Sequence, residues 1–166
     1  MPELFNASDV LETAIRIEEN GEVFYRQAAK KIKTDPVQKI FEFLANEDVK
    51  HRRIFSELLN QAGESKPVEG YSGEYMDYLR AYADRHVFNK ENTGLQKAKL
   101  IKSAKQAIKF AVKIELDSIL FYLEAKTLIP KNQWELVDQI IEEERRHYLK
   151  LLKIQDEIKR KQSGLV

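Results

Sequence analysis

The chain has 166 residues, and its 28 Lys and Arg against 27 Asp and Glu give a net charge of +1, which provides no overall field to attract nucleic acid or an anionic membrane. It has no cysteine, which excludes disulfides, thiolate nucleophiles and cysteine-bound metals in this chain. We expect a single domain over residues 1–166, because soluble domains most often have about 100 to 200 residues. The N-terminal sequence lacks an export signal and no segment approaches about 18 uninterrupted apolar residues, so we expect a cytoplasmic protein that binds neither nucleic acid nor membrane.

Helical periodicity predicts four long helices, because apolar residues recur at alternating steps of three and four. The expected ranges are residues 8–34, 36–62, 95–128 and 130–159. Ser8 or Asp9 is the expected cap of the first helix, and Gly63 is expected to stop the second. Pro36 and Pro130 suit the first turns of the second and fourth helices, because a proline there sacrifices no helical hydrogen bond.

Residues 68–94 separate the second and third predicted helices and contain glycines near both ends. We expect a long crossover here, with one short amphipathic helix from Glu74 to about His86. Two helical hairpins joined by a long crossover form the connectivity of an all-α, ferritin-like four-helix bundle.

An internal repeat supports this arrangement. The segment IEENGEVFY, residues 17–25, matches IELDSILFY, residues 114–122, at a separation of 97 residues. The pair Asp48 and His51 repeats as Glu144 and His147 at a separation of 96 residues. The two halves therefore read as copies of one helical hairpin, related by a pseudo-twofold axis.

Ionisable residues interrupt the inward-facing apolar positions near the middle of each long helix. They are Glu18, Asp48, His51, Glu115, Glu144 and His147. Burying an unpaired carboxylate costs several kcal/mol, so these groups need partners. Two divalent cations would balance the four carboxylates and leave both imidazoles neutral. The alternative is a metal-free bundle whose buried acids pair with His or Lys.

The residue types narrow the choice of metal. Carboxylate and imidazole ligands without sulfur favour iron or manganese over calcium or zinc. We expect two iron ions, with manganese or a mixed pair as the alternative. Glu47 and Glu143 are neighbouring carboxylates, but both fall off the inward-facing positions, so Asp48 is preferred to Glu47 as a ligand.

With these six residues in order on four helices, the sequence resembles the rubrerythrin family of ferritin-like di-iron carboxylate proteins over residues 11–158. The resemblance implies that the six are the metal ligands and catalytic residues, with Asp48 and Glu144 bridging. It also implies that Tyr25 and Tyr122 hydrogen-bond ligand carboxylates. It further implies a homodimeric non-haem di-iron oxidoreductase that acts in the response to oxidative stress. This oxidoreductase would reduce peroxide or oxygen, or oxidise Fe(II), with an external electron donor.

The sequence departs from the family pattern at three points. Asp48 stands where the family has Glu, and Ser118 replaces a further Glu three residues after the ligand of the third helix; Gly21 is the repeat counterpart of Ser118. The chain also lacks the four cysteines of a rubredoxin-like domain. Two alternatives therefore stay open: an iron-sequestering or metal-buffering protein, and a structural bundle with a vestigial metal site.

Overall fold

A computed structural model describes residues 6–62, 73–86 and 88–164 of the chain, which are mostly helical and contain no strand. The elements are α1 (Ala7–Lys31), α2 (Val37–Ala62), α3 (Gly73–Arg85), α4 (Gly94–Leu100), α5 (Ala104–Lys126), the 3-10 turn η1 (Lys131–Gln133) and α6 (Trp134–Gln162). Gly63 and residues 68–72, the predicted stop of the second helix and the start of the crossover, lie outside the described residues.

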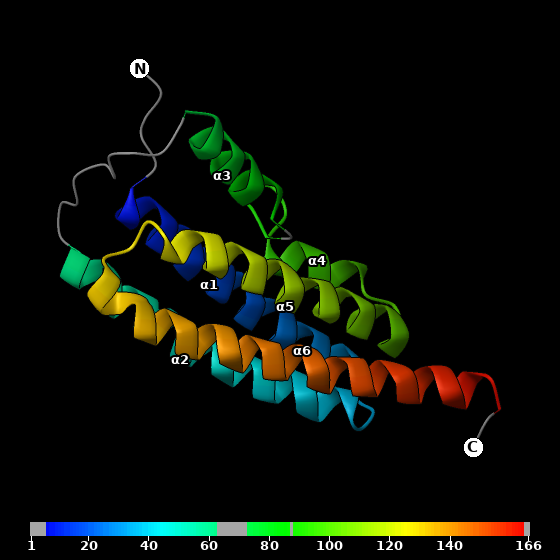
Figure 1. Ribbon diagram of the computed structural model, residues 1–166. Coiled ribbons are helices and arrows are strands. Elements are labelled where there is room, and N and C mark those ends of the chain that lie inside the picture. Colours follow the sequence, from blue (N-terminus) through cyan, green and yellow to red (C-terminus); the bar gives the residue numbers. More distant parts are fainter. Residues whose placement is uncertain (1–5, 63–72, 87, 165–166) are drawn as a thin grey trace.

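The four long helices run alongside one another as a bundle, and α3 projects from one end of it (Figure 1). The α1 helix packs along α2, and α5 packs along α6. Contacts between α1 and α5 and between α2 and α6 close the ring. The predicted all-α bundle of two hairpins joined by a crossover is therefore confirmed. No helix in the described part of the chain is long and apolar enough to cross a membrane.

The first helix begins one residue earlier than predicted, and its cap is Asn6 rather than Ser8 or Asp9. The Asn6 side chain accepts a hydrogen bond from the Asp9 amide, and the Asp9 carboxylate accepts one from the Asn6 amide. This reciprocal pair satisfies amides that the first turn of a helix leaves without partners. The helix ends at Lys31, three residues before the predicted end.

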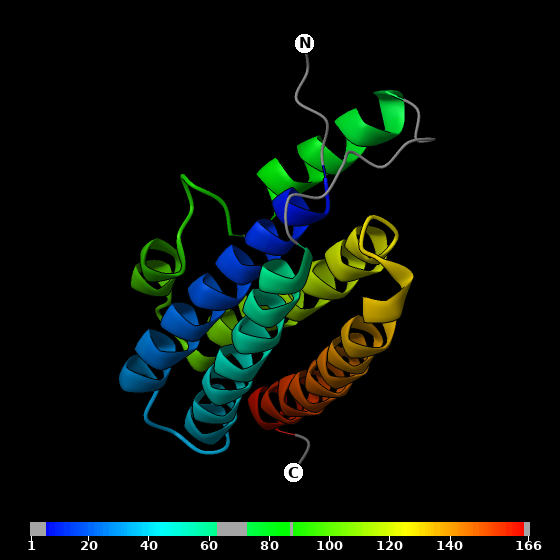
Figure 2. The same cartoon turned by 90° about the vertical axis from the view of Figure 1, so that its left-hand side faces the viewer.

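The prediction of one continuous helix over residues 95–128 is wrong, because α4 and α5 are separated at residues 101–103. Ser103 caps α5 by accepting a hydrogen bond from the Gln106 amide at 3.2 Å. The Lys31 side chain donates to the carbonyls of Ala98 and Ile101 at the end of α4. The contacts of Lys31 hold α4 on the outside of α1 (Figure 2). The crossover thus contains two short helices instead of one.

The fourth helix also starts differently from the prediction. Pro130 precedes the 3-10 turn, and the α-helix begins at Trp134. The Trp134 indole donates to the Ile129 carbonyl at 2.9 Å, which ties the new helix to the end of the preceding connection. The turn lets the chain reverse direction between α5 and α6.

Two apolar clusters fill the bundle on either side of its middle. One contains Tyr25, Phe41 and Ile108, and the other contains Leu11 and Phe55. Both draw residues from all four long helices. The polar layer between them is therefore enclosed by apolar packing at each end, which raises the electrostatic cost of any unpaired charge in it.

Candidate metal centre

The six ionisable side chains singled out in the sequence all lie in this middle layer, and none is more than 5% exposed. They come from the four long helices: Glu18 from α1, Asp48 and His51 from α2, Glu115 from α5, and Glu144 and His147 from α6. The helical spacing of three residues places each acid and histidine of α2 and α6 on one face of the helix. The bundle thus brings together residues up to 129 positions apart in the sequence.

Five of the six side chains form two overlapping triads. Glu18, His51 and Glu144 make one, and Glu115, Glu144 and His147 make the other, with one ligand atom of each residue within 4.8 Å of the others. Glu144 belongs to both. Its Oε1 lies 2.9 Å from Nδ1 of His51, and its Oε2 lies 3.3 Å from Nδ1 of His147. The carboxylate therefore stands between the two imidazoles, where a ligand shared by two cations must lie.

Two buried tyrosines hold the carboxylates of the opposite repeat. The Tyr25 hydroxyl donates to Oε1 of Glu115, and the Tyr122 hydroxyl donates to Oε1 of Glu18. Because each tyrosine is seven residues after the acid of its own helix, the crossed bonds require α1 and α5 to be antiparallel. The second oxygen of each acid is left facing an imidazole. Oε2 of Glu18 and Nδ1 of His51 are 3.6 Å apart, as are the matching atoms of the other half.

Burial and crowding shift the pKa values of this layer. Burial raises the pKa of the Glu18, Asp48 and Glu115 carboxyls, and the negative charge of Glu144 adds to each increase. Burial alone would lower the pKa of His147, but the neighbouring carboxylates of Glu115 and Glu144 raise it to about 9. The same opposition, with the charges of Glu144 and Glu18 dominant, raises the pKa of His51. Without metal, protons therefore neutralise part of the layer.

Two buried atoms of the layer have no hydrogen-bond partner. They are Oε2 of Glu115 and Nδ1 of His51. Nδ1 of His51 lies 2.9 Å from a Glu144 oxygen, but the direction of this approach does not make a hydrogen bond. A carboxylate oxygen and an imidazole nitrogen are both ligands of divalent cations, and buried polar atoms rarely go without a partner. The residues therefore fit a dinuclear centre held by the two triads.

Asp48 is buried beside this centre but belongs to neither triad. Its carboxylate lies against α1, where a Cβ built on Gly21 would come within 2.2 Å of Oδ2 of Asp48. Asp48 and Glu144 are repeat counterparts, so the pseudo-twofold relation fails at this pair. The predicted role of Asp48 as a second bridging ligand stays a prediction, and the triads place Glu144 alone between both histidines.

A third group of ligand atoms lies on the outer side of His51. It consists of Glu47, His51 and Glu143, and Oε2 of Glu143 is 2.8 Å from Nε2 of His51. Glu47 is buried, although its helical position had placed it off the inward-facing positions. The sequence carried a signal for both acids, because Glu47 and Glu143 are 96 residues apart, the separation that relates the two histidines.

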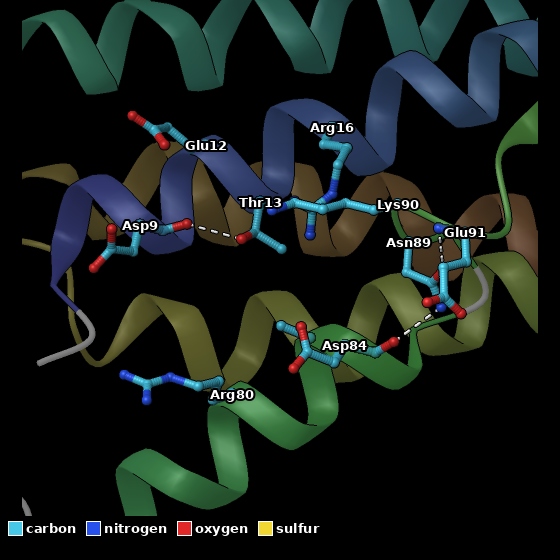
Figure 3. A pocket seen from close by; sticks show the side chains of 10 residues that line it. Asp9, Glu12, Thr13, Arg16, Arg80, Asp84, Asn89, Lys90 and Glu91 are labelled. Carbon is cyan, nitrogen blue, oxygen red and sulfur yellow. Dashed lines mark hydrogen bonds between the residues drawn. The ribbon is translucent and has the colours of Figure 1, made fainter. Parts of the chain in front are cut away.

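A well-formed hollow in the described part of the chain lies elsewhere. It measures about 560 Å³ and is lined by side chains from α1, α3 and residues 89–91 (Figure 3). Its lining mixes acidic residues such as Asp9 and Asp84 with basic ones such as Arg16 and Arg80. None of the six buried residues lines this hollow, so its shape adds nothing to the centre.

A sequence model of the rubrerythrin family matches residues 9–155 of the chain. No curated protein matches the chain. Among solved structures, a candidate ferritin-like diiron-carboxylate protein from Thermotoga maritima is 26% identical, with a TM-score of 0.73 over 95% of this chain and 99% of that chain. A hypothetical protein from Pyrococcus furiosus is 21% identical, with a TM-score of 0.63 over 92% of this chain and 89% of that chain, and shows the fold alone. The bundle is ferritin-like, as predicted.

Proposed function

The chain belongs to the rubrerythrin family, and from that premise we propose that it is a non-haem di-iron oxidoreductase that reduces peroxide or oxygen, or oxidises Fe(II). The observation that carries the proposal is the pair of buried carboxylate and imidazole triads that share Glu144. The description of the Thermotoga maritima structure as a diiron-carboxylate protein supports iron in both positions. The three acids of the triads and the buried carboxylate of Asp48 beside them balance the charge of two divalent ions without any external anion.

When bound, a pair of ferrous ions supplies the two electrons that cleavage of one O–O bond requires, one from each ion. The residues of the chain supply the geometry. Tyr122 and Tyr25 hold Oε1 of Glu18 and Glu115 and so fix the direction of each carboxylate, whose second oxygen faces an imidazole. The apolar clusters on both sides exclude bulk water and strengthen the charge interactions within the layer.

Protons for the reduced oxygen atoms must come from within the layer or through it. The hydroxyls of Tyr25 and Tyr122 hold protons at Oε1 of Glu115 and Glu18, and burial raises the pKa of both hydroxyls, which keeps them protonated. We also propose an external electron donor, because the chain has no cysteine for a rubredoxin-like centre. The proposed assembly is a homodimer.

The test begins with anaerobic protein loaded with Fe(II) and mixed separately with peroxide and with oxygen. We expect close to two irons per chain, oxidised by at least one oxidant much faster than free Fe(II) under the same conditions. Replacing His51 and His147 together by Ala should abolish both the binding and the rapid oxidation. Oxidation no faster than that of free iron would contradict the proposal.

The same protein separates this function from metal storage. A storage protein should continue to take up iron well beyond two ions per chain when Fe(II) and oxidant are added repeatedly. An oxidoreductase should stop at two and turn over peroxide or oxygen once a chemical reductant is supplied. Continued uptake without turnover would favour the sequestering alternative.

A further inference from the structure

Each histidine of the centre has an outer nitrogen that faces the opposite hairpin. Both Nδ1 atoms face the shared Glu144 carboxylate in the interior. Nε2 of His51, on α2, faces Glu143 of α6, and Nε2 of His147, on α6, faces Glu47 of α2. The two outer pairs are thus related by the same repeat as the ligands, although neither acid belongs to the two interior triads.

The outer pairs are unequal. Nε2 of His51 is 2.8 Å from Oε2 of Glu143, which is a hydrogen bond. Nε2 of His147 is 3.9 Å from Oε2 of Glu47, which is too long for one. Glu47 instead forms an ion pair with Lys50, one turn along α2. The ion pair uses Oε1 of Glu47, so Lys50 holds the carboxylate with its other oxygen, Oε2, beyond hydrogen-bond distance of His147.

The repeat counterpart of Lys50 is Arg146, and the described residues give it no ion pair with Glu143. The aromatic surroundings differ as well. The ring of Phe43 packs edge-on against His147, with centroids 5.5 Å apart. The residue that corresponds to Phe43 beside His51 is Gln139, which is exposed on α6. His147 thus has different neighbours from His51 and lacks the outer acceptor that His51 has.

An imidazole binds a cation through one nitrogen only if the other nitrogen carries the proton. A carboxylate that accepts this N–H fixes the required tautomer, fixes the ring direction and makes the ligand more basic. Losing such an acceptor typically lowers metal affinity about 10- to 100-fold. The His51 half is therefore already arranged for a cation, whereas the His147 half must first rearrange.

We propose that Glu143 and Glu47 are the positioning residues of the two histidines, and that Lys50 makes the two metal positions unequal by holding Glu47. The inference rests on the proposed dinuclear centre and adds an order of binding to it. The first divalent ion binds at Glu18, His51 and Glu144. The second binds more weakly at Glu115, Glu144 and His147.

The test is a titration of metal-free protein with Co(II), followed by calorimetry and by the visible absorption of the bound ion, so that no activity is needed. Wild-type protein should bind two ions in resolved steps. Glu143→Ala should weaken the tighter step about 10- to 100-fold. Glu143→Gln, which retains an oxygen acceptor, should weaken it less. The matched control is Glu142→Ala, which removes the same charge from the exposed neighbouring position.

The second arm tests whether Lys50 holds the Glu47 carboxylate away from His147. Lys50→Met should free this carboxylate for His147 and raise the affinity of the weaker Co(II)-binding step. The difference in affinity between the two steps should therefore become smaller. Arg146→Met removes the same charge at the repeat position and should not reduce the difference in Co(II) affinity between the two steps. Far-ultraviolet circular dichroism of each variant shows that the bundle is intact.

The outcomes separate the inference from the function on which it rests. Two ions bound with equal affinity, or a Glu143→Ala variant that behaves like Glu142→Ala, would overturn the inference and leave the dinuclear centre standing. Protein that binds no Co(II) at all would overturn both. A smaller difference in affinity between the two steps in Lys50→Met, but not in Arg146→Met, supports the role of Glu47 specifically.

Discussion

At the scale of single residues, the centre departs from its own symmetry at Asp48 and Gly21. Asp48 is one methylene shorter than its counterpart Glu144 and does not reach the triads. Its carboxylate instead occupies the space beside Gly21 that a side chain on α1 would fill. Two features that look separate in the sequence, the shortened acid Asp48 on α2 and Gly21 on α1, are thus one packing arrangement.

This arrangement predicts a strong coupling between the two positions. In the metal-free protein, Gly21→Ala should lower the free energy of unfolding by about 1–3 kcal/mol, because the new Cβ forces the buried Asp48 carboxylate to move. In an Asp48→Ala background the same change should be neutral or stabilise by up to about 1 kcal/mol, because Ala favours a helix over Gly. Urea unfolding of the four proteins measures the coupling. Equal costs in both backgrounds would show that Asp48 does not occupy this space.

At the scale of elements, the crossover is fixed by α4, which is attached to α1 at both ends. The Gly94 amide donates to Oδ1 of Asn20 at 2.7 Å at the start of α4, and Lys31 donates to the carbonyls at its end. A Cβ on Gly94 would lie 1.9 Å from the Asn20 carbonyl oxygen, which is backbone and cannot rotate away. Only glycine permits this approach.

Gly94→Ala should therefore displace α4 from α1 and lower stability by about 1–3 kcal/mol. We expect the amides of α4 to lose protection against hydrogen exchange while those of α5 keep it, because the two helices are separated at residues 101–103. Gly73→Ala is the control, since nothing lies within 4 Å of a Cβ at that position. Loss of protection throughout the bundle would contradict the local attachment.

At the scale of the whole molecule, protons and metals compete for one buried layer. His147 has an ordinary pKa of 6.5 when unfolded and about 9 in the folded, metal-free protein, so the folded state binds more protons between these values. The stability contributed by this proton is fully present below pH 6.5 and is lost as the pH rises through 9. Raised pKa values of Glu18, Asp48 and Glu115 act in the same direction.

We therefore expect metal-free protein to lose on the order of 1–3 kcal/mol of stability between pH 6.5 and 9.5. Zn(II)-loaded protein should lose much less, because a metal-bound imidazole is already neutral and does not change its protonation state over this pH range. Urea unfolding at the two pH values measures the difference. His147→Gln should flatten the dependence of the metal-free protein. A metal-free protein that became more stable over this range would refute the assignment.

The number and order of the long helices and the identity of the buried ionisable layer could be predicted from the sequence. Helical periodicity and repetition are local or regular signals, and an acid at an inward-facing position, such as Glu18, is conspicuous in any apolar pattern. The break at residues 101–103 could not be predicted, because the chain breaks before Ser103 and uses it as a cap only if α4 has a surface to pack against. The Asn20 and Lys31 contacts that hold α4 come from another helix.

The sequence by itself determined a bundle of two related hairpins with charges that require partners, because the spacing of apolar and ionisable residues sets which face of each helix is buried. Only the tertiary structure decided how those charges are shared. The packing of α2 against α6 places Glu143 at the outer nitrogen of His51, whereas Glu47 pairs with Lys50. The close approach of α1 and α2 places the Asp48 carboxylate beside Gly21. These relations depend on distances between helices, which no spacing along one helix contains.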